Sequence, residues 1–472
     1  MVQLNHEELC EVYRQAENLR FSWDINNGRN DSMHNDQNVN SKARERLGLL
    51  FDDGVYNEIG SLMTEKGKPS GVVCAFGYVN GNEVYAFAQD KEESGGAVGQ
   101  AQANKIAKVY DMAAKTGAPV VGIHDSNGAF MDGTAASLAA YGKMLEASAT
   151  VSGVVPQIAV IAGTCAGSAS ILACSSDFVI MTKESEFFLA PNTSAGSAEA
   201  ASESGIACDV CGDEAAAFAK ARDIINLMPM NNLATLPAFE FEGAVGTGSD
   251  ISDIADKDSV VELSADCGSA SKTALATLGG STVGFVSAGN GAKMKAKDLN
   301  KIARFVRTCD AFSIPVITLV SSEGIDEECT MKAVKAVTTL ANSYSEATTV
   351  KVAVVTGKTV GPVYTAVAGN SSNSDLTYAY NNAVIAPIPS EGAVEFLWHD
   401  KLKGASDLTA ERNKLVSEYE ATLASAQTAA ENGYVDGIVD ASTVRQTLIS
   451  ALDILAGKRV SKLPKKHNNI RF

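Results

Sequence analysis

The chain has 472 residues, with 39 Lys+Arg against 56 Asp+Glu and a formal net charge of −17 at pH 7. An acidic surface repels phosphate backbones, which argues against nucleic acid as a partner. The hydrophobic fraction of 45% suits a large buried core, and no apolar run approaches the roughly 18–20 residues that span a bilayer. Residues 1–15 are acidic and amphipathic, unlike a signal peptide, and the nine scattered cysteines fit reduced thiols. We therefore expect a cytoplasmic protein.

The predicted elements repeat in the two halves of the chain. In the first half we expect strands at 84–89, 119–125, 157–163 and 178–182, with a helix at 101–116. In the second half we expect strands at 283–287, 315–321, 351–357 and 379–386, with a helix at 299–312. Helices that alternate with continuous apolar strands predict an α/β fold with largely buried sheets.

An internal repeat connects the two halves. Asn104-Lys105-Ile106-Ala107 recurs as Asn300-Lys301-Ile302-Ala303, at an offset of 196 residues. The segment IAVIAGTCAG at 158–167 aligns with VAVVTGKTVG at 352–361, at an offset of 194. Such a period is too long for a solenoid repeat and indicates a duplicated domain. We predict an N-terminal domain at 1–235 and a C-terminal domain at 236–472.

Two glycine-bearing turns in each half follow adjacent strands, where α/β folds bind ligands. In the first half these turns are 125–129 and 163–169, and the second runs directly into a helix. The N–H groups at a helix start have no partner inside the helix. Together with an N–H of the first turn, they can hold a carbonyl oxygen that becomes an oxyanion. Such a site suits chemistry on a thioester enolate without a side-chain nucleophile.

Other catalytic motifs are absent from the sequence. It has no Gly-x-Ser-x-Gly elbow, no phosphate-binding loop and no His-Glu-x-x-His helix. Cys208 and Cys211 have no second pair to complete a zinc site, so we interpret them as a surface turn and expect no metal. We expect His124 to be a hydrogen-bonded residue at the end of a strand.

Seven segments resemble the carboxyltransferase subunits of biotin-dependent acyl-CoA carboxylases and decarboxylases, of the propionyl-CoA carboxylase beta and methylmalonyl-CoA decarboxylase alpha type. They lie at 40–59, 89–106, 117–129, 153–170, 303–320, 433–445 and 463–470. The resemblance implies two tandem crotonase-like (ClpP/crotonase) domains. It also implies a ring of dimers, usually a hexamer, in which acyl-CoA binds the N-terminal domain and carboxybiotin binds the C-terminal domain of the partner subunit.

The resemblance also implies site residues in each half. Catalytic backbone groups on the acyl-CoA side are those of Gly128, Ala129, Gly167, Ser168 and Ala169, beside a binding loop of Gly95, Gly96, Ala97 and Asn127. On the biotin side the catalytic residues are Gly361 and Val363, with Tyr364, Thr365 and Gly324 binding the cofactor. The second half departs from the family, because Pro362 has no N–H and Glu323 places a carboxylate before Gly324.

The function implied is transfer of a carboxyl group between biotin and a short-chain acyl-CoA, in either direction. No Met-Lys-Met biotin acceptor occurs, so we expect biotin on a separate carrier protein. The other expected partner is a biotin carboxylase or a membrane decarboxylase subunit, which would place the chain at the periphery of a membrane complex. Two alternatives remain open: a non-catalytic or CoA-binding paralogue that scaffolds such a complex, and a biotin-independent crotonase-type lyase.

Overall fold

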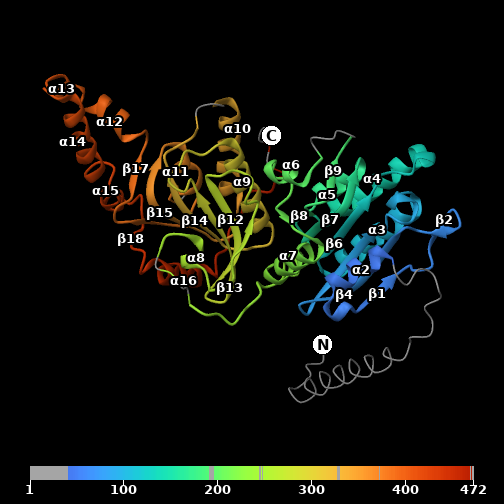
Figure 1. The fold of residues 1–472 in the computed structure, drawn as a ribbon. Coiled ribbons are helices and arrows are strands. Elements are labelled where there is room, and N and C mark those ends of the chain that lie inside the picture. Colours follow the sequence, from blue (N-terminus) through green and yellow to red (C-terminus); the bar gives the residue numbers. More distant parts are fainter. Residues whose placement is uncertain are drawn as a thin grey trace, which may run out of the picture.

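The computed structural model describes residues 41–190, 196–243, 246, 248–326, 330–370, 373–467 and 469. The prediction about residues 1–15 lies outside these ranges. Within these ranges each half of the chain forms an eight-stranded sheet, the first half also has a separate two-stranded sheet, and the two halves lie side by side (Figure 1). None of the helices within the described ranges has the length and hydropathy that crossing a bilayer demands.

The first half contains the following elements. They are α2 (Lys42–Leu50), η1 (Asp52–Gly54), β1 (Tyr56–Ile59), β2 (Thr64–Glu65), β3 (Lys68–Pro69), β4 (Val72–Val79), β5 (Asn82–Gln89), η2 (Ser94–Gly96), α3 (Gln100–Thr116), β6 (Val120–Ser126), η3 (Met131–Gly133), α4 (Thr134–Val151), β7 (Gln157–Ala166), α5 (Ser168–Cys174), β8 (Phe178–Thr182), β9 (Glu186–Phe188), α6 (Ala198–Glu203), β10 (Asp209–Cys211) and α7 (Glu214–Leu227).

The second half repeats much of this succession. Its elements are α8 (Ile251–Ile254), β11 (Val261–Leu263), β12 (Ser271–Leu278), β13 (Ser281–Ala288), α9 (Ala296–Ala311), β14 (Val316–Ser322), α10 (Thr330–Glu346), β15 (Lys351–Val360), α11 (Pro362–Val367), β16 (Leu376–Tyr380), β17 (Val384–Ala386), α12 (Ser390–Leu397), α13 (His399–Lys403), α14 (Leu408–Ala421), α15 (Ala426–Glu431), β18 (Gly437–Val439) and α16 (Val444–Leu455).

The two sheets have the same topology. The first has the strand order β1-β4-β5-β6-β7-β8-β10, with β9 paired to β7, and the second has β11-β12-β13-β14-β15-β16-β18, with β17 paired to β15. In both, an antiparallel hairpin leads into a run of parallel strands. The prediction of an α/β fold with two tandem domains from a duplication is confirmed. The predicted domain boundary at 235/236 lies between α7 and α8 and stays a prediction.

Helices cover both faces of the first sheet, as its continuous apolar strands predict. Every residue of β6 is buried: Val121 and Ile123 face α2 and α7, whereas Val120 faces α3 and α4. Helix α7 packs against β8 of its own half and β12 of the other. The cores of the two halves are therefore continuous.

Two details differ from the sequence prediction. The strand expected at 379–386 is two strands, β16 and β17, because the chain turns between them and β17 pairs further along β15. Cys208 and Cys211 do not form a surface turn: Cys211 belongs to β10, which runs parallel to β8, and both side chains are partly buried.

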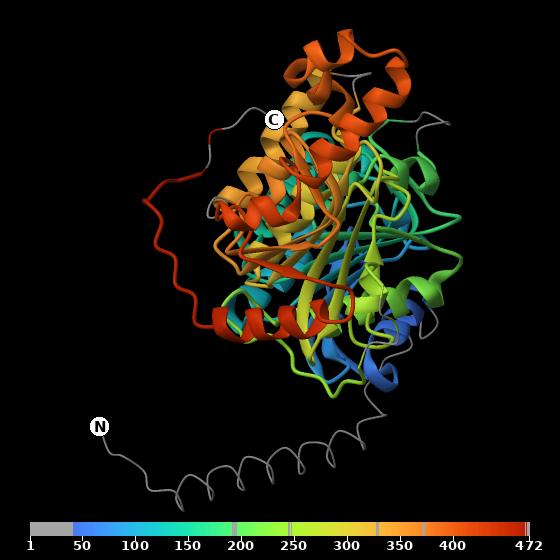
Figure 2. The same cartoon turned by 90° about the vertical axis from the view of Figure 1, so that its left-hand side faces the viewer.

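The halves differ after their small extra strand. Residues 189–208 lead from β9 to β10, whereas residues 387–436 lead from β17 to β18 through α12, α13, α14 and α15. We call α12, α13 and α14 the projecting helices. Their small apolar core includes Val384 and Ala386 of β17, and they stand away from the rest of the sheet at one end of the molecule (Figures 1 and 2). Phe396 and Leu397 on α12 are 84% and 58% exposed.

Candidate active site

The first donor turn follows β6 and is closed by a serine. The Gly128 N–H donates to Ser126 Oγ at 3.0 Å, and the Gly128 carbonyl accepts from the Val98 N–H at 2.9 Å. Gly128 has a φ of 102°, which glycine adopts without strain. Because C=O and N–H point in opposite directions across a trans peptide, the Ala129 N–H faces away from Val98. It has no acceptor among the described residues.

The second donor turn joins β7 to α5. Gly167 has φ 62° and ψ −131°, its N–H donates to the Phe188 carbonyl at 2.9 Å, and its own carbonyl accepts from the Ser170 N–H at 3.1 Å. The Gly167 N–H is therefore not a free donor. The Ser168 N–H, at the start of α5, is without an acceptor in the described part of the chain.

These two turns lie against each other and against the loop at 95–97. A Cβ on Gly128 would come within 3.2 Å of the Ala166 carbonyl oxygen. The Asn127 N–H donates to the Gly95 carbonyl at 3.0 Å, and a Cβ on Gly96 would lie 2.2 Å from the Asp125 carbonyl oxygen, so only glycine fits there. The structure thus brings together all the residues predicted on the acyl-CoA side, including Ala97 and Ala169.

A buried ion-pair network supports the site from the side of α2 and α7. The Asp125 carboxylate accepts from Arg46 at 2.9 Å and from the Thr164 N–H at 3.1 Å, with Lys91 Nζ at 3.7 Å. Arg46 also pairs with Glu214 at 2.9 Å. Burial alone would lower the pKa of Arg46, but its bonds to Glu214 and Asp125 outweigh this and raise it. Sequence reasoning missed this network because its members lie far apart in the chain.

The second half repeats both turns in equivalent geometry. The Gly324 N–H donates to Ser322 Oγ at 3.2 Å, and the Gly324 carbonyl accepts from the Met294 N–H at 2.9 Å. Gly361 has φ 60° and ψ −128°, and its N–H donates to the Ala386 carbonyl at 2.8 Å. The recurring Ser-x-Gly spacing is the sequence signal for this closure.

The free donors differ between the halves. Ile325 takes the place of Ala129, and its N–H has no acceptor among the described residues. Pro362 takes the place of Ser168 and has no N–H, so the next available group is the N–H of Val363. The second half therefore lacks one donor of the pair that the first half presents.

An apolar groove lies beside the altered turn. Its cavity measures ≈ 620 Å³ and is lined by Val337, Ala341, Gly361, Pro362, Tyr364, Thr365, Ala366, Ile385, Ala386 and Pro387. A smaller cavity of ≈ 280 Å³ reaches Ile325 from the other side of Pro362. The Tyr364 hydroxyl donates to the Tyr434 carbonyl at 2.8 Å, and burial raises the pKa of this phenol. Of the residues predicted on the biotin side, Gly361, Tyr364 and Thr365 border this groove, whereas Val363 is buried in α11 and Gly324 lies in the neighbouring turn.

Glu323, beside Gly324, is exposed and lies near an ammonium group. Lys358 Nζ pairs with Glu420 of the projecting helices at 2.8 Å. The pKa of Lys358 is raised, chiefly by the hydrogen bond to Glu420 and to a lesser degree by the charges of Glu391 and Glu323. The positive charge of Lys358 offsets part of the negative charge that Glu323 brings to this turn.

His124 immediately precedes the first donor turn. His124 is buried with its ring edge against Phe87, and burial lowers its pKa to about 4. Its Nδ1 has no hydrogen-bond partner among the described residues, so the expected hydrogen-bonded histidine is wrong. Nowhere in those residues do three or more His, Cys, Asp or Glu side chains gather as a metal ion would require.

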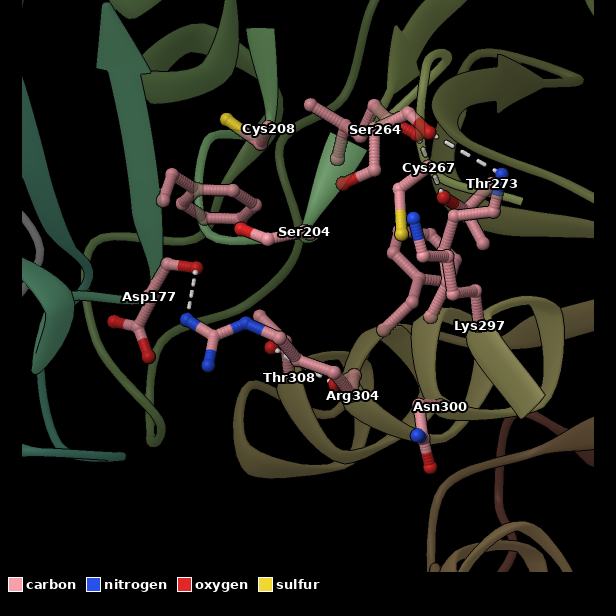
Figure 3. Close-up of a pocket in the computed structure, with 15 residues that line it drawn as sticks. Asp177, Ser204, Cys208, Ser264, Cys267, Thr273, Lys297, Asn300, Arg304 and Thr308 are labelled. Carbon is pink, nitrogen blue, oxygen red and sulfur yellow. Dashed lines mark hydrogen bonds between the residues drawn. The ribbon is translucent and has the colours of Figure 1, made fainter. Parts of the chain in front are cut away.

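Another cavity, of ≈ 200 Å³, lies where the two halves meet (Figure 3). Arg304 of α9 crosses this junction and donates to the carbonyls of Ser176 and Asp177, at 2.9 and 3.2 Å. Asp177 precedes β8, at the amino end of the first sheet. The donor turns follow the carboxyl ends of the strands, so this cavity is separate from them.

The glycine turns and their free N–H groups form, in each half of the duplicated fold, a site of the kind that holds an oxyanion with backbone donors. The chain belongs to the carboxyl transferase domain family, whose profile matches residues 35–470. The resemblance drawn from the sequence segments is confirmed.

Named relatives cover nearly the whole chain. The chain is 33% identical over 479 residues to the methylmalonyl-CoA decarboxylase subunit alpha of Propionigenium modestum, covering 91% of this chain and 92% of that one. It is 32% identical over 481 residues to the propionyl-CoA carboxylase carboxyltransferase subunit of Haloferax mediterranei, covering 91% and 93%. A crystal structure of transcarboxylase 12S, a hexamer with methylmalonyl-coenzyme A and methylmalonic acid bound, matches with a TM-score of 0.85 and 31% identity, covering 91% and 92%.

Proposed function

We propose that this chain is the carboxyltransferase subunit of a biotin-dependent complex. It moves a carboxyl group between biotin on a separate carrier protein and a short-chain acyl-CoA of the acetyl/propionyl or malonyl/methylmalonyl type. Family membership supports the reaction class, and the names of the relatives support a CoA thioester. The observation that carries the proposal is the pair of donor turns in each half, in which Gly167 and Gly361 agree within 3° in φ and ψ.

The first half is the acyl-CoA side of the proposal. The N–H groups of Ala129 and Ser168 receive the thioester oxygen, which gains negative charge when the α-carbon becomes an enolate. Preorganised N–H donors stabilise such a charge without reorganising during the reaction. In the carboxylating direction the α-carbon loses its proton and forms the new carbon–carbon bond. In the decarboxylating direction the same enolate collects the electron pair of the bond that breaks.

The second half is the biotin side. The groove beside Gly361 is apolar and large enough for a bicyclic ring. Ile325 lines the adjoining smaller cavity, and the Val363 N–H belongs to the first turn of α11. Bound biotin supplies the ring nitrogen that carries the carboxyl group and takes up the substrate proton. The chain's own contribution is to exclude water from the groove and to direct these N–H groups at the oxygen of the ureido group. Because Pro362 has no N–H, this half stabilises its oxyanion less than the first half does.

Assembly with a second copy follows from the separation of the two sites. Helices α5 and α11 lie in different halves of the molecule (Figure 1). Transfer requires reacting atoms roughly 3–3.5 Å apart, so one chain cannot supply both sites to one reaction. Pairing the first half of one copy with the second half of another solves this, in an isologous dimer from which a hexamer can be built.

Two alternative functions, a scaffold without activity and a biotin-independent lyase, are less well supported. A scaffold without activity does not explain why the first half keeps two free donors in ordered turns. A biotin-independent lyase does not explain why the second half keeps the same turn geometry beside an open groove. The experiment below separates all three.

The test follows the carboxyl group itself. Purified protein is incubated with malonyl-CoA or methylmalonyl-CoA labelled in the free carboxyl group, with free biotin or a biotinylated carrier domain. We expect label to pass to biotin in a product that avidin captures before it decarboxylates.

Label lost as carbon dioxide without biotin would indicate the lyase. Binding of CoA thioesters with no turnover in either direction would indicate the scaffold.

A further inference from the structure

Two buried serines outside the predicted catalytic set make equivalent contacts in the two halves. Ser126 Oγ accepts the Gly128 N–H at 3.0 Å and lies 3.4 Å from the Gly128 carbonyl oxygen. Ser322 Oγ accepts the Gly324 N–H at 3.2 Å and donates to the Gly324 carbonyl at 3.1 Å. Both serines are 0% exposed. Neither hydroxyl can reach a bound substrate from this position.

Each hydroxyl determines which N–H of its turn is free. Gly128 and Gly324 have φ of 102° and 109°, a region with several nearby backbone conformations for glycine. The serine occupies the glycine N–H, and Val98 or Met294 occupies the glycine carbonyl. With both ends of the glycine held, the planar peptide that follows directs the next N–H, of Ala129 or Ile325, away from the strand.

From this geometry we propose that Ser126 and Ser322 are positioning residues, each aligning the free N–H of its own half. Ser126 acts through Gly128 on the Ala129 donor, and Ser322 acts through Gly324 on the Ile325 donor. The inference rests on the proposed function, because it assigns the two serines to the acyl-CoA and biotin sides respectively.

The consequence of losing each hydroxyl follows from hydrogen bonding. Without Oγ the buried glycine N–H has no acceptor, and a buried unpaired donor is unfavourable. Rotation of the neighbouring peptide relieves this and turns the free N–H away from the oxyanion. A misplacement of about 1 Å can cost about 10²-fold in rate. The Ser322 hydroxyl shares its proton with the Ala292 carbonyl at 3.0 Å, and this carbonyl also accepts the Glu323 N–H at 3.3 Å, so it keeps one donor when the hydroxyl is lost.

Ser126→Ala and Ser322→Ala form a matched pair of variants. The assays are kcat and KM for carboxyl transfer from methylmalonyl-CoA to free biotin. The affinities for CoA and for a nitro analogue of propionyl-CoA are measured as well. The nitronate form of this analogue mimics the enolate. We expect each variant to lower kcat by about 10- to 100-fold. Ser126→Ala should weaken nitronate binding by a similar factor and leave CoA affinity unchanged, whereas Ser322→Ala should leave both affinities unchanged.

A buried serine away from the turns is the control. Ser148 Oγ donates to Gln157 Oε1 at 2.7 Å on α4, and Ser148→Ala removes a similar buried contact. It should leave kcat and nitronate affinity as in the parent. Ser126→Thr keeps the hydroxyl and should recover most of the activity. The Ser148→Ala and Ser126→Thr variants remain informative if Ser126→Ala or Ser322→Ala folds poorly.

The outcomes distinguish this inference from the proposed function. If the parent transfers carboxyl groups and both alanine variants match it, the serines do not position the donors. Equal loss of CoA and nitronate affinity in Ser126→Ala would also overturn the inference, because it would indicate general damage. If the parent neither transfers carboxyl groups nor prefers the nitronate over CoA, the proposed function itself fails.

Discussion

Pro362 stands at the first position of α11, where the first half has Ser168 at the start of α5. Proline fits this position well, because an N–H there has no partner in the helix and φ near −65° suits the first turn. The preceding glycines adopt nearly the same conformation in both halves. The substitution therefore changes the chemistry of the turn and leaves its shape intact.

Ser168→Pro should consequently fold and lose one oxyanion donor. Removing such a donor costs about 10²–10³ in kcat. We expect this loss in carboxyl transfer, with CoA affinity within about threefold of the parent, measured by steady-state kinetics and calorimetry. Ser168→Ala, which keeps the N–H, is the control. Parental turnover in a folded Ser168→Pro protein would show that this N–H does not serve the reaction.

Pro362→Ser is the reverse change in the second half. It restores an N–H in a turn whose backbone already matches that of the first half. We expect faster transfer to and from free biotin, by up to about 10²-fold where this donor is used. Affinity for CoA should not change. No gain in an active protein would mean that the Val363 N–H already compensates for the proline.

At the scale of elements, α9 of the second half is attached to the amino end of the first sheet. Arg304 holds the carbonyls of Ser176 and Asp177, and in Figure 3 it points across the junction toward Asp177. Burial raises the pKa of Asp177 to about 6, although the Gln157 N–H and the charge of Arg304 act in the opposite direction. The native state thus binds the Asp177 proton more tightly than the unfolded chain does.

This raised pKa has a definite sign for stability. Protonated Asp177 contributes to the free energy of unfolding. This contribution is full below the pKa of about 4 in the unfolded chain and is lost as the pH rises through the native pKa of about 6. Asp177→Asn should therefore be more stable than the parent at pH 7, by at most about 3 kcal/mol, and the difference should vanish below about pH 4. Unfolding midpoints across this pH range measure it.

Asp375 provides the matched control. Asp375 accepts the N–H of Lys351, the first residue of β15, at 2.8 Å, as Asp177 accepts that of Gln157 at the start of β7, but Asp375 also pairs with Lys458 at 2.8 Å. Asp375→Asn breaks that ion pair and should destabilise the protein at pH 7. If Asp177→Asn also destabilises it there, the charge of Asp177 is compensated in the native state.

At the scale of the whole molecule, the projecting helices break the symmetry of the duplication. They carry exposed Phe396 and Leu397, which suit contact with another protein surface. Lys358 of β15 pairs with Glu420 of α14, which ties these helices to the sheet, and Ser390 of α12 donates to the same carboxylate. We expect these exposed side chains to contribute to the contact between copies in the proposed assembly.

Phe396→Glu with Leu397→Glu should weaken this assembly. Two carboxylates in an apolar contact are costly, so we expect a smaller particle by analytical ultracentrifugation and reduced carboxyl transfer that recovers at higher protein concentration. Leu463→Glu, at a residue 89% exposed near the C-terminus, is the control. An unchanged particle mass would place the interface elsewhere.

Local sequence signals determined much of this fold. Apolar periodicity located strands such as β8 at the predicted bounds, and the 196-residue repeat indicated the duplication, because both patterns reflect which residues must be buried. Glycines 128, 167, 324 and 361 marked the turns, since positive φ excludes most other residues.

Only the tertiary structure decided which N–H groups remain free. The Gly167 N–H is occupied by the Phe188 carbonyl, and the Gly128 carbonyl by the Val98 N–H, both from other segments of the chain. The network of Arg46, Asp125 and Glu214 likewise joins residues from three elements. A sequence specifies conformational preference residue by residue, but the acceptor that consumes a donor is set by the packing of distant segments. The donors for the reaction were therefore decided by the packed fold.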